Sequence, residues 1–129
     1  MSVKDFVQQR RDALIAMRRD FHMYPEPAWL EYRSAAKVAD TLISLGYDVA
    51  LGADVLDLDS RMGLPSDEVM KAAMDRAIEE GANPELVEKM GYGKTAIVAT
   101  MKFGGEGPVV AFRVDMDSND VIEAKEDNH

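Results

Sequence analysis

EYRSAAKVADTLISLGYDVAL, residues 31–51, decides the class of fold, because it joins an amphipathic helix directly to a strand. Apolar side chains recur every three or four positions between Tyr32 and Leu45, which predicts a helix over residues 31–45 with one buried face. Gly46 stands where a left-handed C-terminal cap ends such a helix. The alternating residues from Tyr47 to Leu51 predict a short strand. The chain is therefore expected to mix helices and sheet.

The residues before this stretch predict one amphipathic helix over residues 3–23. Ser2 and Asp5 resemble a capping box at its start, with Asp in place of the usual Glu. Pro25 and Pro27 are expected to end the helix, because the residue before a proline disfavours the helical conformation. A short connection then leads into the helix over residues 31–45.

The residues after it, 52–92, are predicted to form an insertion between strands. The insertion opens with a loop and continues with helices over residues 67–80 and 84–90. Ser66 and Asn83 are residue types that cap helix starts, and a proline directly after Asn83 suits a first helical position.

Two β-branched runs follow, Thr95–Phe103 and Pro108–Val114, and only residues 104–107 separate them. A connection this short predicts an antiparallel hairpin. The continuous apolar run over residues 109–112 predicts burial on both faces. The order of elements predicts an α/β or α+β fold, with helices packed on a mixed sheet in one domain over residues 1–129.

Composition excludes several classes of function. The chain has 129 residues with 15 basic and 24 acidic side chains, a formal charge of −9 that disfavours nucleic acid and anionic membranes as partners. It has no cysteine and only His22 and His129 as histidines, so it lacks thiolate zinc sites and any histidine-rich metal centre. No apolar run approaches the roughly 20 residues that span a bilayer, and a cytoplasmic location is the default expectation.

The acidic segment that begins at Asp115 has two chemical interpretations. As a twelve-residue calcium loop, it places oxygen ligands at Asp115, Asp117, Asn119 and Glu126. Asp120 opposes this interpretation, since the sixth position of such a loop is normally glycine, and the preceding run predicts a strand rather than a helix. As the end of a buried strand, the same segment places Asp115 and Asp117 on one side, at the edge where α/β proteins commonly hold their active sites.

Other candidate motifs favour structural roles. Residues 91–95, Gly-Tyr-Gly-Lys-Thr, resemble the end of a phosphate-binding loop, but Glu88 replaces the required first glycine and a strand follows instead of a helix. His22 has no base or nucleophile beside it in sequence, and a lone histidine near a helix end is most often structural. Trp29, the one tryptophan, is expected to be a packing anchor.

Two segments carry a resemblance to a known family. Residues 18–26, Arg-Arg-Asp-Phe-His-Met-Tyr-Pro-Glu, followed by Trp29 and Glu31, resemble the opening signature of the M20 metallopeptidase and amidohydrolase family. Residues 111–117, Ala-Phe-Arg-Val-Asp-Met-Asp, look like its strand-end motif. A branch with a helical insertion is indicated by three further matches, at residues 51–52, 60–65 and 96–100.

The resemblance implies a metal-dependent hydrolase with a zinc-peptidase-like catalytic domain. Members use two divalent ions, usually zinc or manganese, to cleave amide bonds, here of p-aminobenzoyl-glutamate or a related N-acyl amino acid. Asp117 matches the catalytic aspartate, and Asp115 matches a position that is a histidine ligand in other branches. His22 and Glu26 match the opening signature, for which we expect a structural role. Ser118 and Asn119 stand where many members have alanine and leucine.

The resemblance covers this whole chain but only the opening part of a family member. The later Cys-Gly-His-Asp-Gly-His motif, the Glu-Glu pair, the final metal histidine and the lid domain have no counterparts here. We therefore expect an N-terminal fragment that binds no metal by itself and is inactive alone. Its expected partners are the acyl amino acid substrate of the parent, a homologous second subunit, and other copies through exposed strand edges.

Overall fold

The computed structural model describes residues 2–121 and divides into two compact units. The larger unit is Glu26–Ser118, and the smaller one contains residues up to Pro25 together with those from Asn119 onward. No helix in residues 2–121 is both long enough and apolar enough to cross a membrane.

The smaller unit contains helices α1 (Val3–Gln9) and α2 (Arg11–Met23). The predicted capping box is confirmed, since the Ser2 hydroxyl accepts a hydrogen bond from the Asp5 N–H and the Asp5 carboxylate accepts one from the Ser2 N–H. The prediction of one helix over residues 3–23 is wrong. The Arg10 N–H bonds to the Val7 carbonyl only three residues back, and its backbone leaves the helical region. Residues 8–11 are Gln-Gln-Arg-Arg, so an unbroken helix would bury no apolar side chain there.

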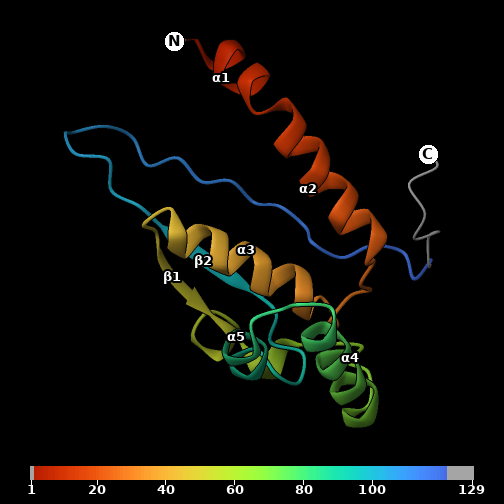
Figure 1. Ribbon diagram of the computed structural model, residues 1–129. Coiled ribbons are helices and arrows are strands. Elements are labelled where there is room, and N and C mark those ends of the chain that lie inside the picture. The colour runs from red at the N-terminus through yellow and green to blue at the C-terminus, as the bar shows by residue number, and fades with distance from the viewer. Residues whose placement is uncertain (1, 122–129) are drawn as a thin grey trace. The chain divides into compact units, whose positions relative to one another are not determined.

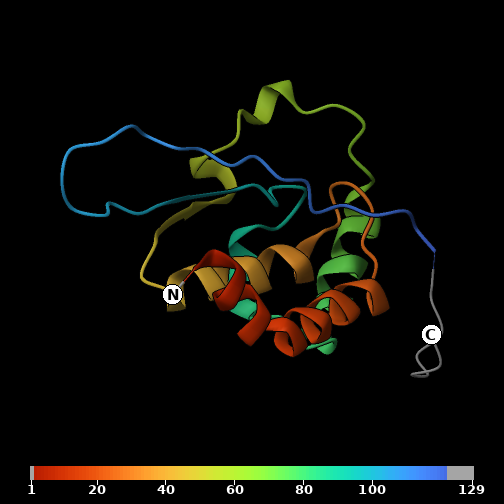
Figure 2. The same cartoon turned by 90° about the horizontal axis from the view of Figure 1, so that it is seen from above.

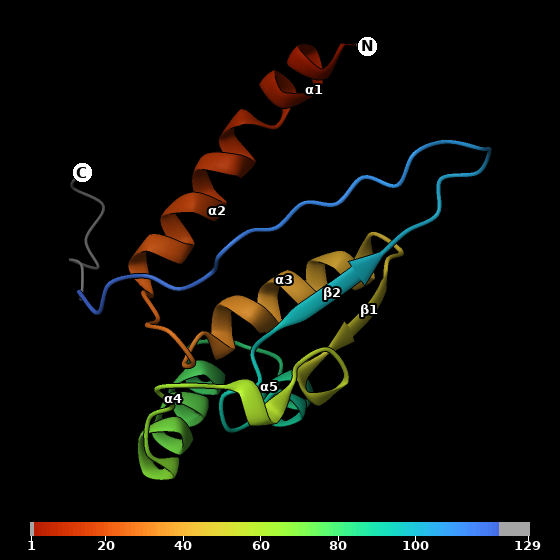
Figure 3. The same ribbon diagram turned by 180° about the vertical axis from the view of Figure 1, so that it is seen from behind.

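The core of the larger unit lies around α3 (Tyr32–Ser44), where a helix was predicted. This helix contacts the two-stranded sheet as well as α4 (Asp67–Glu79) and α5 (Pro84–Lys89). Figures 1 and 3 show α3 lying along one face of the sheet. The cluster of buried apolar residues is Tyr32, Ala35, Ala36, Ala39, Leu51, Ala73, Ala77, Ala82, Val87 and Met90.

The sheet consists of β1 (Asp48–Leu51) and β2 (Ile97–Thr100), which pair antiparallel. Asp48 pairs with Thr100 and Leu51 with Ile97. The predicted combination of helices and sheet is thus confirmed, with β1 close to its predicted position and β2 shorter than its predicted run.

Residues 52–96 separate the two strands, and the insertion over residues 52–92 stays a prediction. A loop with short 3-10 turns at Gly52–Asp54 and Leu58–Ser60 leads into α4, and Figure 2 shows it arching away from α3. The Ser66 hydroxyl accepts the Val69 N–H at the start of α4, and Asn83 caps α5 with Pro84 at its first turn. The sequence signals for both helix starts are therefore confirmed.

The predicted strand over residues 108–114 is not formed, and neither is the hairpin. The segment is drawn in Figures 1 and 2 as a run with no strand arrow. Val109 is 98% exposed and Phe112 is 89% exposed, so the predicted burial on both faces is wrong for the described residues. β2 ends at Thr100, before the glycine-rich loop, and the only strand partner that the described residues give β2 is β1. The apolar run therefore has neither a paired strand nor a covering layer among residues 2–121.

Candidate functional site

Residues 115–118 follow a segment that forms no strand, so the strand-end interpretation of Asp115 and Asp117 stays a prediction. Met116 is partly buried and packs against the core, and Ser118 bonds to Glu26. Asp115 precedes Met116, and Asp117 lies between Met116 and Ser118. Both aspartates are exposed to solvent. The two carboxylates of this segment are therefore exposed, while Met116 and Ser118 contact other residues of the larger unit.

The fastening point is a close pairing of Glu26 with Ser118, 92 positions apart in sequence. The Ser118 N–H donates to the Glu26 carbonyl at 2.9 Å, and the Glu26 N–H donates to the Ser118 Oγ at 3.1 Å. A longer contact of 3.4 Å joins the same Oγ to the Glu26 carbonyl. The opening signature and the acidic segment are therefore in direct contact, which the sequence alone did not predict.

The Glu26 side chain is buried, with 2% exposure, at the start of α3. Its Oε1 accepts the Arg33 N–H at 2.8 Å and its Oε2 accepts the Ser34 N–H at 2.7 Å. Burial raises the pKa of the Glu26 carboxyl above its usual range, while hydrogen bonds from Ser34 and Arg33 and the positive charge of Arg76 oppose that rise. A carboxylate also suits this place because helix N-termini favour negative charge.

One of the two outward carboxylates takes part in an ion pair on its own segment. The Arg113 Nη1 lies 2.8 Å from the Asp115 Oδ2, and both side chains are largely exposed. Such an exposed pair is screened by water and contributes little to stability. Asp115 and Asp117 are therefore accessible to a ligand or to another part of a larger protein.

The calcium-loop interpretation gains no support from the structure. Glu126, its twelfth-position ligand, lies outside the described residues. Within residues 2–121, no group of three or more histidine, cysteine or acidic side chains is placed to hold a metal ion. The segment before Asp115 is extended, whereas a calcium loop of this kind follows a helix.

The glycine-rich turn over residues 91–95 is a structural junction. The Gly93 N–H donates to the buried Tyr32 hydroxyl at 2.9 Å. The Arg61 Nη1 donates to the carbonyls of Tyr92 and Gly93 at 2.9 and 3.2 Å. A phosphate-binding loop presents backbone N–H groups to its ligand. Here the Gly93 N–H is bonded to Tyr32, and the Lys94 N–H is bonded to the Met90 carbonyl at 3.0 Å, which favours a structural role for the turn. Arg61 carried no sequence signal for this role.

Trp29 lies at a second junction, between the opening signature and the loop before α4. Its Nε1–H donates to the Met62 carbonyl at 3.1 Å. Its backbone φ of 68° lies in the left-handed region, which is costly for a residue with a side chain. The bond connects Trp29 to this loop, whereas its role as a packing anchor stays a prediction.

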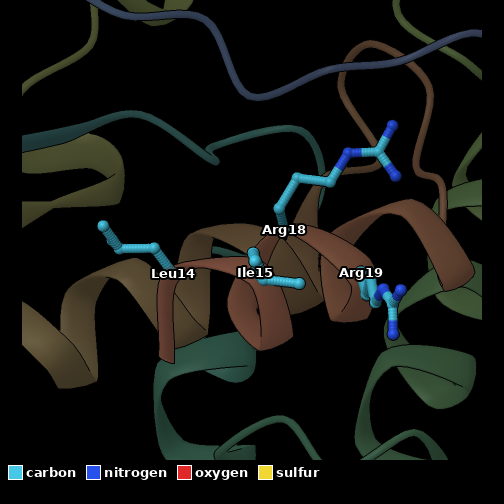
Figure 4. Close-up of a pocket in the computed structure, with 4 residues that line it drawn as sticks. All are labelled: Leu14, Ile15, Arg18 and Arg19. Atoms are coloured by element: carbon cyan, nitrogen blue, oxygen red, sulfur yellow. The ribbon is translucent and has the colours of Figure 1, made fainter. Parts of the chain in front are cut away.

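The smaller unit carries an open hollow on α2. Figure 4 shows that Leu14, Ile15, Arg18 and Arg19 line it. His22, at the end of the same helix, is partly buried. None of the four lining residues carries a hydroxyl, a thiol or a carboxylate.

A scan against models of known protein families finds no match for this sequence. Indole-3-acetyl-aspartic acid hydrolase of Enterobacter agglomerans is 43% identical over 98% of this chain. A subunit of p-aminobenzoyl-glutamate hydrolase from Escherichia coli K12 is also 43% identical, over 99% of this chain. The chain spans 29% of the length of each of these two relatives.

A solved structure agrees with these relatives. The crystal structure of an aminobenzoyl-glutamate utilization protein from Klebsiella pneumoniae superposes with a TM-score of 0.88 and 46% identity. The match covers 93% of this chain and 30% of that one. The chain thus shares its sequence and its fold with part of a group of hydrolases. Within that group, its homologues over nearly its whole length include the Escherichia coli p-aminobenzoyl-glutamate hydrolase.

Proposed function

We propose that this chain is the N-terminal part of a metal-dependent amidohydrolase that cleaves p-aminobenzoyl-glutamate or a related N-acyl amino acid. The observation that carries the proposal is its 43% identity, over almost its whole length, to two hydrolases whose names give such substrates. Both names describe an aromatic acyl group joined to an acidic amino acid. The substrate is therefore proposed to present an aromatic ring on one side of the amide and carboxylates on the other.

Asp117 and Asp115 are proposed as the contribution of this chain to the active site. Both are outward-facing carboxylates on a fastened segment, and carboxylate oxygens suit zinc, manganese and other divalent ions. When bound, such an ion polarises a carbonyl and activates water. Asp117 is proposed to orient the metal site, and Asp115 to stand where other branches have a histidine ligand.

The donors among residues 2–121 do not complete a metal centre. Two neighbouring carboxylates are fewer than the three protein ligands of a typical catalytic zinc site, and residues 2–121 hold no larger cluster. The remaining ligands are proposed to come from the part of the parent protein that has no counterpart here.

Partners and location stay predictions. The Escherichia coli relative is named as one subunit of its hydrolase, so a second, homologous subunit is a proposed partner of the parent protein. Self-association is proposed to use the exposed run over residues 109–114, and a cytoplasmic location remains the expectation from the sequence.

A chimera tests the proposed function. The matching segment of the Escherichia coli p-aminobenzoyl-glutamate hydrolase chain is replaced by this chain, and the protein is produced with its second subunit. Release of p-aminobenzoate and glutamate is then measured with added manganese or zinc. We expect hydrolysis by the chimera, and Asp117→Asn is expected to lower kcat/KM about 10- to 100-fold.

Asp120→Asn is the matched control, because Asp120 is an exposed acid of the same stretch to which the proposal gives no role. It should leave kcat/KM unchanged. An inactive chimera that is folded and assembled would overturn the proposed function. Equal effects of the two substitutions would overturn the assignment of Asp117.

A further inference from the structure

We propose that Glu26 is a positioning residue that links helix α3 to the acidic segment and thereby holds Asp115 and Asp117 in place. The inference rests on the proposed function for the role of the two aspartates, but the link itself is a feature of this chain. Glu26 acts at both ends. Its carboxylate holds the N-terminus of α3, and its peptide group holds Ser118.

The peptide end depends on the sequence Pro25-Glu26-Pro27. The residue before a proline favours an extended backbone, so Pro27 restricts Glu26 to that region. The N–H and carbonyl of an extended residue project sideways, as they do in a strand. The Glu26 carbonyl accepts the Ser118 N–H, and the Glu26 N–H donates to the side-chain Oγ of Ser118.

The carboxylate end depends on the start of α3. The first N–H groups of a helix have no partner within the helix, and Glu31, the residue at its cap position, makes no capping bond to them. Glu26 satisfies two of them, at Arg33 and Ser34, from outside the helix. Because α3 is the central helix of the core, this bond fixes Glu26 to the most buried element of the larger unit.

The consequence for the aspartates follows from alternation. With Ser118 paired to Glu26 and Met116 packed on the core, the side chains between and before them are directed outward. A shift at Glu26 therefore moves the backbone of Asp117, the residue directly before Ser118. A displacement of about 1 Å at a catalytic group can cost ~100-fold in rate.

The test compares Glu26→Gln with Glu31→Gln in this chain. Glu31 stands at the start of the same helix, but its carboxylate accepts only the Thr95 hydroxyl among the described bonds, so it is the matched control. Backbone NMR then follows amide hydrogen exchange at Ser118 and the chemical shifts of residues 115–118. In Glu26→Gln we expect exchange at Ser118 to rise about tenfold more than exchange in the α3 core.

If Glu26 only stabilised the unit, Glu26→Gln would raise amide exchange throughout the unit by one factor, and such a uniform rise would overturn the inference. Unchanged amide exchange at Ser118 in a folded Glu26→Gln variant would overturn it as well. If Glu26→Gln fails to fold, Ser118→Ala tests the same link. That variant removes one acceptor and keeps the backbone bond, and it should shift residues 115–118 with α3 unchanged. No shift in Ser118→Ala would then count against the link.

The chimera separates this inference from the proposed function. Glu26→Gln there should lower kcat with little change in KM, because it displaces Asp117 without removing a substrate contact. A rise in KM at constant kcat would contradict a positioning role. An inactive chimera with the selective NMR effect intact would count against the proposed function and leave the link standing.

Discussion

At the scale of single residues, Gly93 occupies the most constrained position of the glycine-rich turn. Its φ is +71°, and a Cβ at this position would lie 2.5 Å from the Cδ2 of Leu64 and 3.4 Å from the Sδ of Met70. Both the backbone conformation and the surrounding side chains therefore require glycine.

Gly93→Ala is expected to lower the free energy of unfolding by about 2–3 kcal/mol, of which the left-handed backbone supplies ~1–2 kcal/mol. Urea denaturation measures the loss. Gly63→Ala is the control, because Gly63 has the same φ of +71° and a Cβ added there would meet no atom within 4 Å. Equal losses in the two variants would show that the contact with Leu64 contributes nothing.

Local sequence patterns predict some features of the candidate site but not its long-range contact. The period of an extended segment predicts that Asp115 and Asp117 lie on one side of the chain, and this stays a prediction because Val114 and Ser118 are exposed as well. The hydrogen bonds between Glu26 and Ser118 could not be predicted from a local sequence pattern. They join residues 92 positions apart, and no local pattern encodes a contact of that separation.

At the scale of elements, α3, α4 and α5 were predictable because each carries its own signals. Ser66 and Asn83 mark two helix starts, and the apolar period of residues 31–45 marks α3. The strand prediction for residues 108–114 was wrong for the opposite reason, because among residues 2–121 this run lacks partners that would stabilise a strand. Apolar, β-branched residues indicate a strand only where partners cover them, and a strand gains its stability from neighbours elsewhere in the chain.

The exposure of this run makes a direct prediction about stability. Phe112→Ser should change the free energy of unfolding by no more than about 0.5 kcal/mol, since the Phe112 side chain is 89% exposed. Met90→Ala, at a fully buried residue of the core, should cost about 2–5 kcal/mol. Thermal or urea unfolding of the two variants checks both. A large loss in Phe112→Ser would mean that the run is covered in solution, as it would be in a self-associated form.

At the scale of the whole molecule, the chain folds and its acidic segment is bonded to Glu26. Its described residues do not complete a metal centre. It spans 29% of the length of its two hydrolase relatives, and it overlays a solved relative with a TM-score of 0.88 across 30% of that structure. The same backbone is thus compatible with a much larger protein. Hydrolysis of an amide by a metal-activated water needs several ligands and a proton-transfer group held at once.

The purified 129-residue chain is therefore expected to release no p-aminobenzoate from p-aminobenzoyl-glutamate, with or without added zinc or manganese. The physical reason is the donor set, because residues 2–121 contain no cluster of three potential ligands and Asp115 and Asp117 alone leave a metal ion mostly hydrated. Chromatography measures the released p-aminobenzoate, and the chimera is assayed in parallel for comparison. Turnover by the chain alone, abolished by Asp117→Asn, would show that a working centre assembles from these residues or from copies of this chain.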